Sequence, residues 1–408
     1  MAFQQGLSGL NAASKALDVI SNNVANSGNV GFKLGSTLFS DVYAAALNGA
    51  AAGVQVGIGT AVGAVRQQFS QGNITPTNNP LDVAINGAGF FRMSQDGAIS
   101  YTRNGQFDVD KNGYIVNAQG LRLTGYPADA TGAILPASPT DIQIDTADLQ
   151  PNPTSEINLG LNLDSRATAP TAAFDFTDPT TYNSSTSVTV YDSLGNDHIA
   201  TMYFVKTGGG FWDVYQQLDG GATTLASAAS PTLTFDTSGA LTAGANNTLT
   251  LAIPASFGAA TPQSVTLDFT GSTQYGSAFG VNRQTQDGYA SGRLSGITIS
   301  EDGTVQGRYS NGQSRNLGQI VIANFASPNG LISLGNNLWA ESPASGQPLV
   351  GAPGTGSLGV LVAGSVEESN TDLTAELVNM ITQQRAYQAN AQSIKTQDQI
   401  LQTLVNLR

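Results

Sequence analysis

Apolar residues recur at helical spacing in the first 24 residues of the chain. Steps of three and four residues place one set of side chains on the same side of a helix. The apolar members of this N-terminal stripe are Phe3, Leu7, Leu10, Leu17 and Val24, with the small residues Ser14 and Ser21 between them. Asn22, Asn23, Asn26 and Gly28 tolerate left-handed backbone, so the helix is predicted to end near them.

The C-terminus carries a longer pattern of the same kind. No Gly or Pro interrupts residues 370–408, which predicts a helix of about 36 residues, about 54 Å long at 1.5 Å per residue. Ser369 and Asp372 have capping-box spacing at its start. The apolar members of this C-terminal stripe are Leu373, Leu377, Met380, Tyr387, Ala391, Ile394, Leu401 and Val405, with Gln384 and Asp398 on the same seam. Heptad spacing over this length is typical of a coiled coil.

Between the two ends, short alternating runs predict β-structure. Strands are expected at 81–85, 187–191, 201–205, 265–269 and 318–323. Turn dipeptides that suit type I′ hairpins separate such runs. They are Asp96-Gly97, Asn104-Gly105, Asn112-Gly113, Asp302-Gly303 and Asn311-Gly312.

Composition is roughly symmetric about the centre of the chain, which indicates domains nested in sequence. The fold class we expect is multidomain: a discontinuous, coiled-coil-like terminal α-helical domain and two mainly-β domains nested in sequence. Residues 1–72 and 362–408 would form the terminal helical domain with an adjoining extended linker. Residues 73–145 and 285–361 would form an inner β domain, and residues 146–284 an outer β domain inserted in it.

Charge and cysteine content exclude several classes of protein. A net charge of −13 leaves no basic stripe for phosphates, so we expect no nucleic-acid partner. No apolar run is long enough to span a bilayer, so we expect no membrane insertion. The chain has no cysteine, which excludes disulfides and thiol chemistry. A cleavable secretion signal is not recognisable at residues 1–15, although the Thr/Ser/Asn/Gly-rich composition resembles that of exported bacterial proteins.

The candidate chemical motifs predict ordinary structure. Residues 354–359 match G-x-G-x-x-G, but prolines precede them and an apolar run follows, so a loop is expected. Residues 108–113 match half of a calcium loop, but the twelfth position is Gln119, so a hairpin turn is expected. His198, the single histidine, is interpreted as a solvated turn residue. Most aspartates stand in turn contexts. We therefore expect no enzyme and no cofactor or metal.

For the two helical stripes the pattern leaves two interpretations open. They could pack together as a helical hairpin within one chain. They could also pack against copies of themselves, because helices of marginal length without their own core fray in isolation.

The segment Ser21-Asn22-Asn23-Val24-Ala25-Asn26-Ser27-Gly28-Asn29-Val30-Gly31-Phe32-Lys33 resembles the A-N-N-x-A-N-x-x-T-x-G-F-K signature of bacterial flagellar rod and hook proteins. It departs from that signature at Ser21 and Asn29. The matching motif residues are Asn22, Asn23, Ala25, Asn26, Gly31, Phe32 and Lys33. Further segments resemble the same family at 81–91, 101–107, 369–373 and 384–391, and those at 159–164 and 187–195 resemble hook proteins in particular.

This resemblance implies a structural subunit of the flagellar hook. Such subunits self-assemble into a helical tube that acts as a flexible universal joint and transmits torque from rod to filament. The implied partners are copies of the chain, rod and hook–filament junction proteins, the hook cap and the type III export apparatus. The implied location is the hook of the basal body, outside the cell, reached without a cleaved signal. Phe3 and Leu7 resemble the short element used at the export gate.

Three alternatives remain at this stage. A distal rod protein would share the end motifs but should lack a large central insertion. A hook–filament junction protein would have longer helical regions. A secreted β-rich carbohydrate-binding protein or glycosidase would fold completely as a monomer and show a cleft with paired acids.

Overall fold

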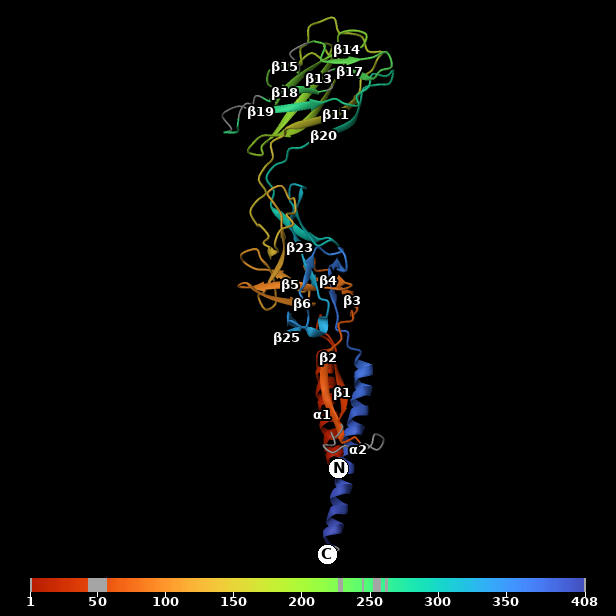
Figure 1. Ribbon diagram of the computed structural model, residues 1–408. Coiled ribbons are helices and arrows are strands. Elements are labelled where there is room, and N and C mark those ends of the chain that lie inside the picture. Colours follow the sequence, from red (N-terminus) through yellow and green to blue (C-terminus); the bar gives the residue numbers. More distant parts are fainter. Residues whose placement is uncertain are drawn as a thin grey trace. The chain divides into compact units, whose positions relative to one another are not determined.

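The computed structural model combines two terminal helices with many short strands (Figure 1). It describes residues 2–42, 57–226, 230–243, 246–251, 258–260 and 263–406. Contacts divide the chain into two units. Unit 1 comprises residues 1–146, 296–308 and 314–408, and unit 2 comprises residues 147–295 and 309–313. The expected division into three nested domains stays a prediction.

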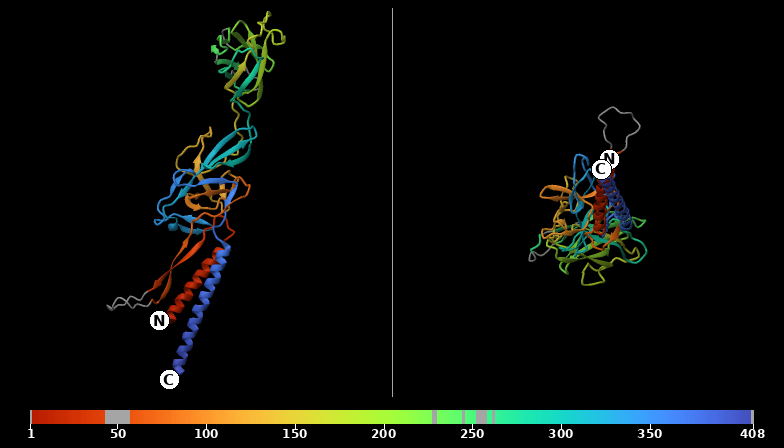
Figure 2. Two further views of the ribbon diagram at one scale, coloured as in Figure 1. Left: turned by 90° about the vertical axis from the view of Figure 1, so that its right-hand side faces the viewer. Right: turned by 90° about the horizontal axis from the view of Figure 1, so that it is seen from below.

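The terminal helices of unit 1 are α1 (Ala2–Ala25) and α2 (Leu373–Asn406). They lie side by side (Figures 1 and 2). The pair is antiparallel, because Gly6 near the start of α1 lies against Ile394, whereas Asn23 near its end contacts Glu376. The helical-hairpin arrangement is therefore present within one chain, and a coiled coil is not established. Neither helix is both long and apolar enough to cross a membrane, as far as the described residues go.

The helix α2 begins three residues later than a cap at Ser369 would require. Asp372 is the capping residue, since its Oδ1 accepts hydrogen bonds from the amides of Thr374 at 2.8 Å and Ala375 at 3.2 Å. The predicted capping box is wrong: the Ser369 side chain instead bonds to Thr371. The acidic side chain of Asp372 also suits the positive end of the helix dipole.

A β-hairpin occupies part of the segment that was expected to be an extended linker. Its strands are β1 (Gly35–Val42) and β2 (Gly59–Gln67), which pair antiparallel with a register shift after Leu38. Both strands pack against α1. The alternating small and β-branched residues of β2 explain its extended conformation.

The rest of unit 1 is mainly a branched β-sheet with the strand order β21-β22-β23-β9-β5-β6-β26-β25. Its aromatic core contains Phe90, Tyr101, Phe325 and Trp339 in edge-to-face contacts. A 3₁₀ turn lies at Pro328–Gly330. The further strands that lie wholly or mainly in unit 1 are β3 (Ile74–Pro76), β4 (Val83–Asn86), β5 (Phe90–Gln95), β6 (Ala98–Thr102), β7 (Phe107–Val109), β8 (Ile115–Asn117), β9 (Arg122–Pro127), β10 (Thr140–Asp141), β21 (Leu294–Ile299), β22 (Thr304–Tyr309), β23 (Ser314–Ile320), β24 (Ile322–Asn324), β25 (Ile332–Gly335), β26 (Leu338–Ala340), β27 (Leu349–Gly351), β28 (Val360–Ala363) and β29 (Ser365–Glu367).

Unit 2 contains two sheets that share one apolar core. The sheets have the orders β18-β19-β11-β20 and β12-β13-β14-β16-β17. Inward residues of both, such as Leu159, Leu267, Phe204 and Val214, are fully buried in this core, as in a β-sandwich. Its strands are β11 (Glu156–Asn162), β12 (Ser184–Tyr191), β13 (Asp197–Lys206), β14 (Phe211–Leu218), β15 (Thr223–Leu225), β16 (Leu233–Phe235), β17 (Leu241–Ala243), β18 (Asn246–Leu251), β19 (Gln263–Asp268) and β20 (Gly280–Gln286).

The turn dipeptides do not share one turn type. Positive φ at both residues occurs at Asp96-Gly97, which joins β5 and β6. At Asn112-Gly113, Asp302-Gly303 and Asn311-Gly312, φ is positive at the glycine alone. A type I turn followed by a left-handed glycine has this pattern, so the type I′ prediction is wrong there. Asn104-Gly105 is not a hairpin turn, because β6 pairs with β5 and β26.

The three candidate chemical motifs lie in turns or at the start of a strand. Residues 354–359 form turns between β27 and β28, and residues 108–113 lie in the β7–β8 hairpin. The interpretation of His198 as solvated is wrong: it is 5% exposed at the start of β13. Its Nδ1 lies 2.6 Å from Asp219 Oδ2 and its Nε2 3.5 Å from Asp192 Oδ2. In the β12–β13 pair, His198 stands opposite Val190, which is fully buried.

Candidate assembly site

A buried ion cluster joins the two ends of the chain to the β-sheet of unit 1. Glu367, at the end of β29, is fully buried. Its Oε1 lies 2.6 Å from Lys33 Nζ, and its Oε2 lies 3.1 Å from Arg103 Nη1. The same carboxylate accepts a hydrogen bond from the amide of Gly72 at 2.9 Å. Three segments far apart in sequence therefore meet at one side chain.

The two cations of this cluster also bind backbone oxygens. Lys33 Nζ donates to the carbonyl of Ser70 at 2.7 Å, and Arg103 donates to the carbonyls of Ile85 and Gly87. Burial lowers the pKa of Lys33, and the charge of Glu367 partly opposes that shift. Burial likewise lowers the pKa of Arg103, against the effect of Glu367. One carboxylate thus compensates two buried cations with the help of carbonyl dipoles.

Gly31 is required by close packing at this cluster. Its φ is +71°, and a Cβ placed there would lie 2.5 Å from the amide nitrogen of Asn104. Its own amide donates to the carbonyl of Glu367 at 2.8 Å. Only glycine combines this backbone conformation with this approach.

Two asparagine side chains connect backbone segments around the cluster. Asn23 is 2% exposed, and it exchanges hydrogen bonds with Gly35 at 2.8 and 2.9 Å while donating to Glu376 Oε2 at 3.0 Å. Asn370 accepts from the amide of Leu34 at 2.8 Å and donates to the carbonyl of Gln68 at 2.8 Å. Together they hold α1, the hairpin and α2 in one arrangement.

The remaining motif residues are nearer the surface. The Asn26 side chain donates to the carbonyl of Asn22 at 2.9 Å, and the Asn26 backbone amide donates to the same carbonyl at 3.1 Å. Phe32 is half-buried, and Asn22 and Ala25 are exposed. The structure therefore assembles Asn23, Gly31 and Lys33 into the cluster region and leaves the other motif residues around it.

The face of α1 that packs inside the chain is made mostly of small residues, not of the predicted stripe. Phe3 is 47% and Leu7 43% exposed, and Leu10, Leu17 and Val24 are half-buried. The buried positions are Gly6, Ala12, Ala13, Ala16, Ile20 and Asn23. At Gly9 a Cβ would lie 2.8 Å from the Asn390 side chain, so the small residues allow a close approach to α2.

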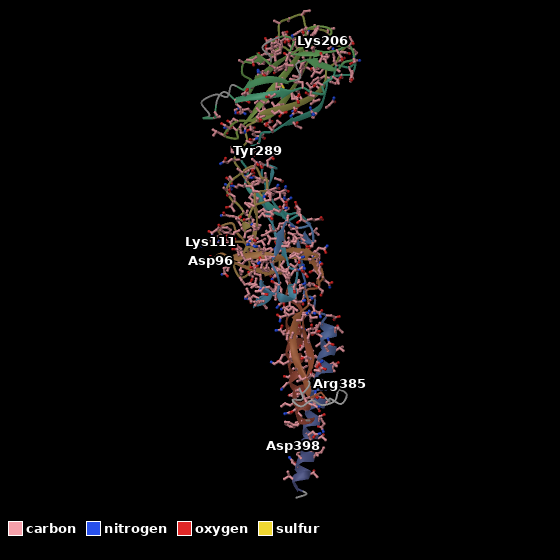
Figure 3. The ribbon with its side chains drawn as sticks, in the orientation of Figure 1. Asp96, Lys111, Lys206, Tyr289, Arg385 and Asp398 are labelled. Carbon is pink, nitrogen blue, oxygen red and sulfur yellow. The ribbon has the colours of Figure 1, made fainter. Side chains whose placement is uncertain are left out.

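The predicted stripe on α2 is also largely exposed. Met380, Ala391 and Ile394 are half-buried. Leu373, Leu377, Tyr387, Leu401 and Val405 are exposed by 46%, 44%, 38%, 55% and 74%. Figure 3 shows Arg385 and Asp398 on the same helix. Among the α2 side chains whose burial the structure describes, Glu376 is the buried one, at 7% exposure, and it contacts Asn23 of α1. Pairing within the chain therefore leaves most of the apolar stripe uncovered.

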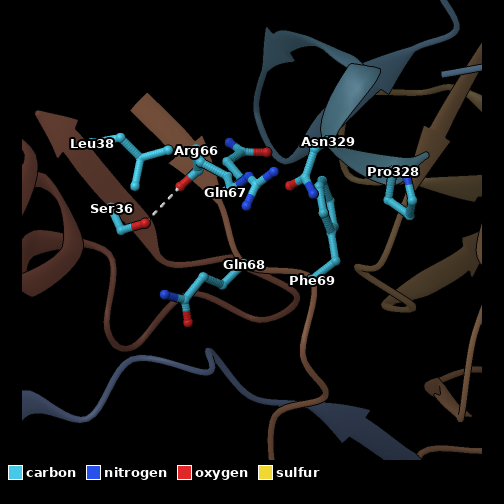
Figure 4. A pocket seen from close by; sticks show the side chains of 8 residues that line it. All are labelled: Ser36, Leu38, Arg66, Gln67, Gln68, Phe69, Pro328 and Asn329. Atoms are coloured by element: carbon cyan, nitrogen blue, oxygen red, sulfur yellow. Dashed lines mark hydrogen bonds between the residues drawn. The ribbon is translucent and has the colours of Figure 1, made fainter. Parts of the chain in front are cut away.

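The β1–β2 hairpin adds further exposed apolar side chains and two grooves. Leu38, Phe39, Val62 and Val65 are 45%, 46%, 37% and 56% exposed. One groove lies beside Leu38 and is shown in Figure 4, where Ser36 Oγ donates to the Arg66 carbonyl at 3.4 Å. Apolar atoms make up most of its lining surface, although Arg66, Gln67 and Gln68 line it too. A second groove lies between α1 and β2.

Sequence reasoning missed several of these residues. Glu367, Arg103 and Glu376 carry no local pattern that distinguishes them from surface charges. Asn370 and Arg103 do lie in segments that resemble the family, and this resemblance could have marked them as candidate site residues. The small residues of the buried α1 face also recur at helical spacing in the sequence. The larger apolar residues favoured a different face of the helix.

Comparison with known proteins relates four segments of the chain to families of flagellar proteins. Residues 3–33 match the family "Flagella basal body rod protein", and residues 362–407 match "Flagellar basal body rod FlgEFG protein C-terminal". Residues 84–155 match "Flagellar hook protein FlgE/F/G D1 domain", and residues 162–289 match "Flagellar basal body protein FlaE D2 domain". The chain is 46% identical over 415 residues to the flagellar hook protein FlgE of Escherichia coli, with both proteins covered in full. The chain belongs to the flagellar hook protein family.

Other hook proteins agree over the same length. The identity is 45% over 414 residues with the hook protein of Salmonella typhimurium, covering 100% of both, and 33% over 410 residues with that of Brucella suis, covering 100% of this chain and 98% of the relative. The crystal structure of Helicobacter pylori hook protein FlgE2 matches with a TM-score of 0.51 at 16% identity, covering 72% of this chain and 99% of the other. That likeness concerns the fold.

The chain is a structural subunit of the bacterial flagellar hook, located in the hook of the basal body. Full-length identity to hook proteins favours this role over a distal rod protein. The family is structural and not enzymatic. As in the family, the chain self-polymerises and assembles with other flagellar components.

Proposed function

We propose that the exposed apolar faces of α1, α2 and the β1–β2 hairpin form the contacts between subunits in a helical tube. The tube would act as a universal joint that carries torque from rod to filament while bent. One observation carries this proposal: large apolar side chains stay exposed along α2, from Leu377 at 44% to Val405 at 74%. Exposed apolar side chains that recur along one helix mark a surface that binds another protein.

The energetics require several neighbours for each subunit. Burying one leucine or valine side chain contributes about 1.5–3 kcal/mol. Association costs about 4–15 kcal/mol in lost translational and rotational freedom. Several apolar contacts per subunit offset this cost, and head-to-tail contacts that do not close on themselves build a helical filament.

Flexibility would come from weak contacts between the β-rich parts. These parts are rich in Thr, Ser and Gly, and 11% of all residues are charged, which limits repulsion between crowded copies. Polar, weakly bound outer surfaces can slide when the tube bends, while the helical layer stays closed. Hooks of the wild-type protein that are straight and rigid in electron micrographs would contradict this.

Export without a cleaved signal is the expected route, with Phe3 and Leu7 as the element read at the export gate. Both side chains are exposed and accessible near the start of α1. In a hook-deficient strain, Phe3→Ala and Leu7→Ala should reduce the amount of chain in the culture supernatant. A Leu401→Ala chain, altered only in the assembly stripe, should be secreted at the wild-type level.

The further partners we propose are the rod, the hook–filament junction proteins, the hook cap and the type III export apparatus. A hook is continuous with the rod at one end and with the junction at the other. The same terminal helices would therefore contact these neighbours. Affinity capture with a variant altered in the exposed apolar stripe of α2 should recover less of these partner proteins.

The double variant Leu401→Gln/Val405→Gln tests the assembly surface. It removes two exposed apolar side chains near the end of α2, so monomer stability should stay within about 0.5 kcal/mol of wild type. The critical concentration for polymerisation should rise at least tenfold. Leu135→Gln is the matched control, because Leu135 is 48% exposed on the β part of unit 1. Wild-type polymerisation of the double variant would overturn the proposal.

A further inference from the structure

The helix α1 has neighbours on two sides, and a third side is open. The small-residue face packs against α2, and the hairpin packs alongside. A groove runs between α1 and β2, and one of its lining residues, Asn23, also donates to Glu376 of α2. Its α1 lining includes Lys15, Asp18 and Asn22. At 100° per residue these positions point nearly opposite to Gly6, Gly9 and Ala13.

This groove has apolar walls and a charged rim. Val19 and Phe32 are half-buried in it. Val62 and Val65 of β2 line it at 37% and 56% exposure. Lys15 Nζ and Asp18 Oδ2 form an exposed pair 3.4 Å apart at the rim. No described residue of α2 lines the groove, so α2 of the same chain does not fill it.

The chain carries a helix face of matching character elsewhere on unit 1. Leu373, Leu377 and Ile381 are spaced by four residues on α2 and are exposed by 46%, 44% and 51%. Arg385 follows at the same spacing and is exposed. An apolar helix face in an apolar groove is a common mode of recognition, and Arg385 complements Asp18 at the rim.

We propose that α2 of a second copy occupies the groove between α1 and β2, with Leu373, Leu377 and Ile381 against Val19, Phe32, Val62 and Val65. This inference rests on the assembly function proposed above and specifies which surfaces meet. Groove and stripe are different surfaces of one chain, so the contact is head-to-tail and does not close on itself. Each α1 then lies between its own α2 and that of a neighbour, which continues the helical layer from copy to copy.

Cysteine cross-linking tests this contact cleanly, because the natural chain has no cysteine. One variant carries Val65→Cys and the other Ile381→Cys, and an affinity tag on one distinguishes their masses. The two chains are mixed in equal amounts, polymerised, oxidised and separated without reductant. Disulfides form where Cα atoms lie about 4.4–6.8 Å apart. Val62→Cys with Leu377→Cys forms a second pair that covers a small shift in register.

We expect the mixed disulfide to exceed either homodimer at least tenfold, and to form in the polymer but not in the dilute monomer mixture. Lys111→Cys replaces Val65→Cys as the control, because Lys111 is an exposed residue of the β7–β8 turn, and it should give no mixed product. Both cysteine sites are exposed, and unchanged thermal melting confirms folding.

The other outcomes overturn the inference in distinguishable ways. A polymer without mixed disulfide from either pair means that another occupant, or none, fills the groove, while the assembly function stands. Predominant Ile381–Ile381 products mean that α2 helices pair symmetrically. Absence of any polymer from the wild-type chain removes the proposed function and this inference together.

Discussion

Lys33 and Glu367 are separated by 334 positions in the chain, and their side chains meet at 2.6 Å with no solvent exposure. The pair fixes the segment after α1 to the strand that precedes α2. Because Arg103 binds the same carboxylate, the contact also includes the β-sheet of unit 1. A subunit that transmits force between its terminal helices and its β-sheet needs such a connection.

Removing the shared carboxylate should strongly destabilise unit 1. In Glu367→Ala, Lys33 and Arg103 remain buried without a counter-charge, and the expected loss is about 3–5 kcal/mol in the free energy of unfolding. The chain has two tryptophans, Trp212 in unit 2 and Trp339 in unit 1. Denaturant titration followed by Trp339 fluorescence in a Trp212→Phe background therefore reports on unit 1. The control Asp18→Ala removes an exposed pair and should cost under about 1 kcal/mol; equal effects would contradict the prediction.

Gly31→Ala should destabilise the same region by about 2 kcal/mol or more. The positive φ is costly for alanine, and the new methyl group would collide with the backbone at Asn104. Gly28→Ala is the matched control three residues away, because a Cβ there meets nothing within 4 Å. Thermal unfolding of both variants checks this, and a Gly31→Ala melting temperature equal to that of Gly28→Ala would show that the close approach is absent.

Asp372→Ala should weaken the start of α2 by about 0.5–2 kcal/mol, since the amides of Thr374 and Ala375 lose their acceptor. Ser369→Ala should cost less, because Ser369 bonds outside the helix. Hydrogen exchange at residues 374 and 375 measures the difference. Faster exchange in Ser369→Ala than in Asp372→Ala would restore the capping box that the sequence suggested.

The stability of unit 2 should fall as the pH rises above about 6.5. Burial alone lowers the pKa of His198, but Asp219 and Asp192 beside the ring raise it above its usual value overall. A raised folded-state pKa stabilises the fold below the unfolded value, about 6.5, and this contribution is lost as the pH rises through the folded value. Burial raises the pKa of Asp192, but hydrogen bonds from Asn196 and Leu194 outweigh burial, so the pKa is lowered overall. Asp192 therefore titrates in the acid range and does not contribute to the slope above pH 6.

Unfolding free energies between pH 6 and 9, followed by Trp212 fluorescence in a Trp339→Phe background, check the direction. The variant His198→Gln keeps a polar side chain and should flatten the slope. A slope of the same size in His198→Gln would assign the pH dependence to another group.

Trypsin should cut the dilute monomer first after Arg385 and Lys395, and later after Lys33. The first two residues are exposed on α2, which extends past the start of α1 and frays from its end. Lys33 is 1% exposed. Mass spectrometry of early fragments gives the order. Early cleavage after Lys33 would mean that the buried cluster opens in solution, and in the polymer the α2 sites should become protected.

The positions of both helices followed from the sequence because helical periodicity is local. The strands at 187–191, 201–205 and 265–269 lie within or nearly within β12, β13 and β19, because alternation is local as well. The sequence predicted turn types and helix caps less well, because one residue type fits two local structures. Asp-Gly and Asn-Gly fit two turn types, and Ser369 and Asp372 both cap helices well.

Of the candidate site, the sequence by itself determined which residues are apolar at helical spacing and which segment carries the family motif. Only the tertiary structure decided which face of α1 packs inside the chain, that Lys33 meets Glu367, and that His198 is buried between two aspartates. The reason is physical: local spacing fixes the side of a helix on which a residue lies, whereas burial and charge pairing depend on other helices and strands, which for Lys33 and Glu367 lie 334 positions apart. On α1, glycine and alanine permit close contact with α2, and Phe3 and Leu7 stay exposed.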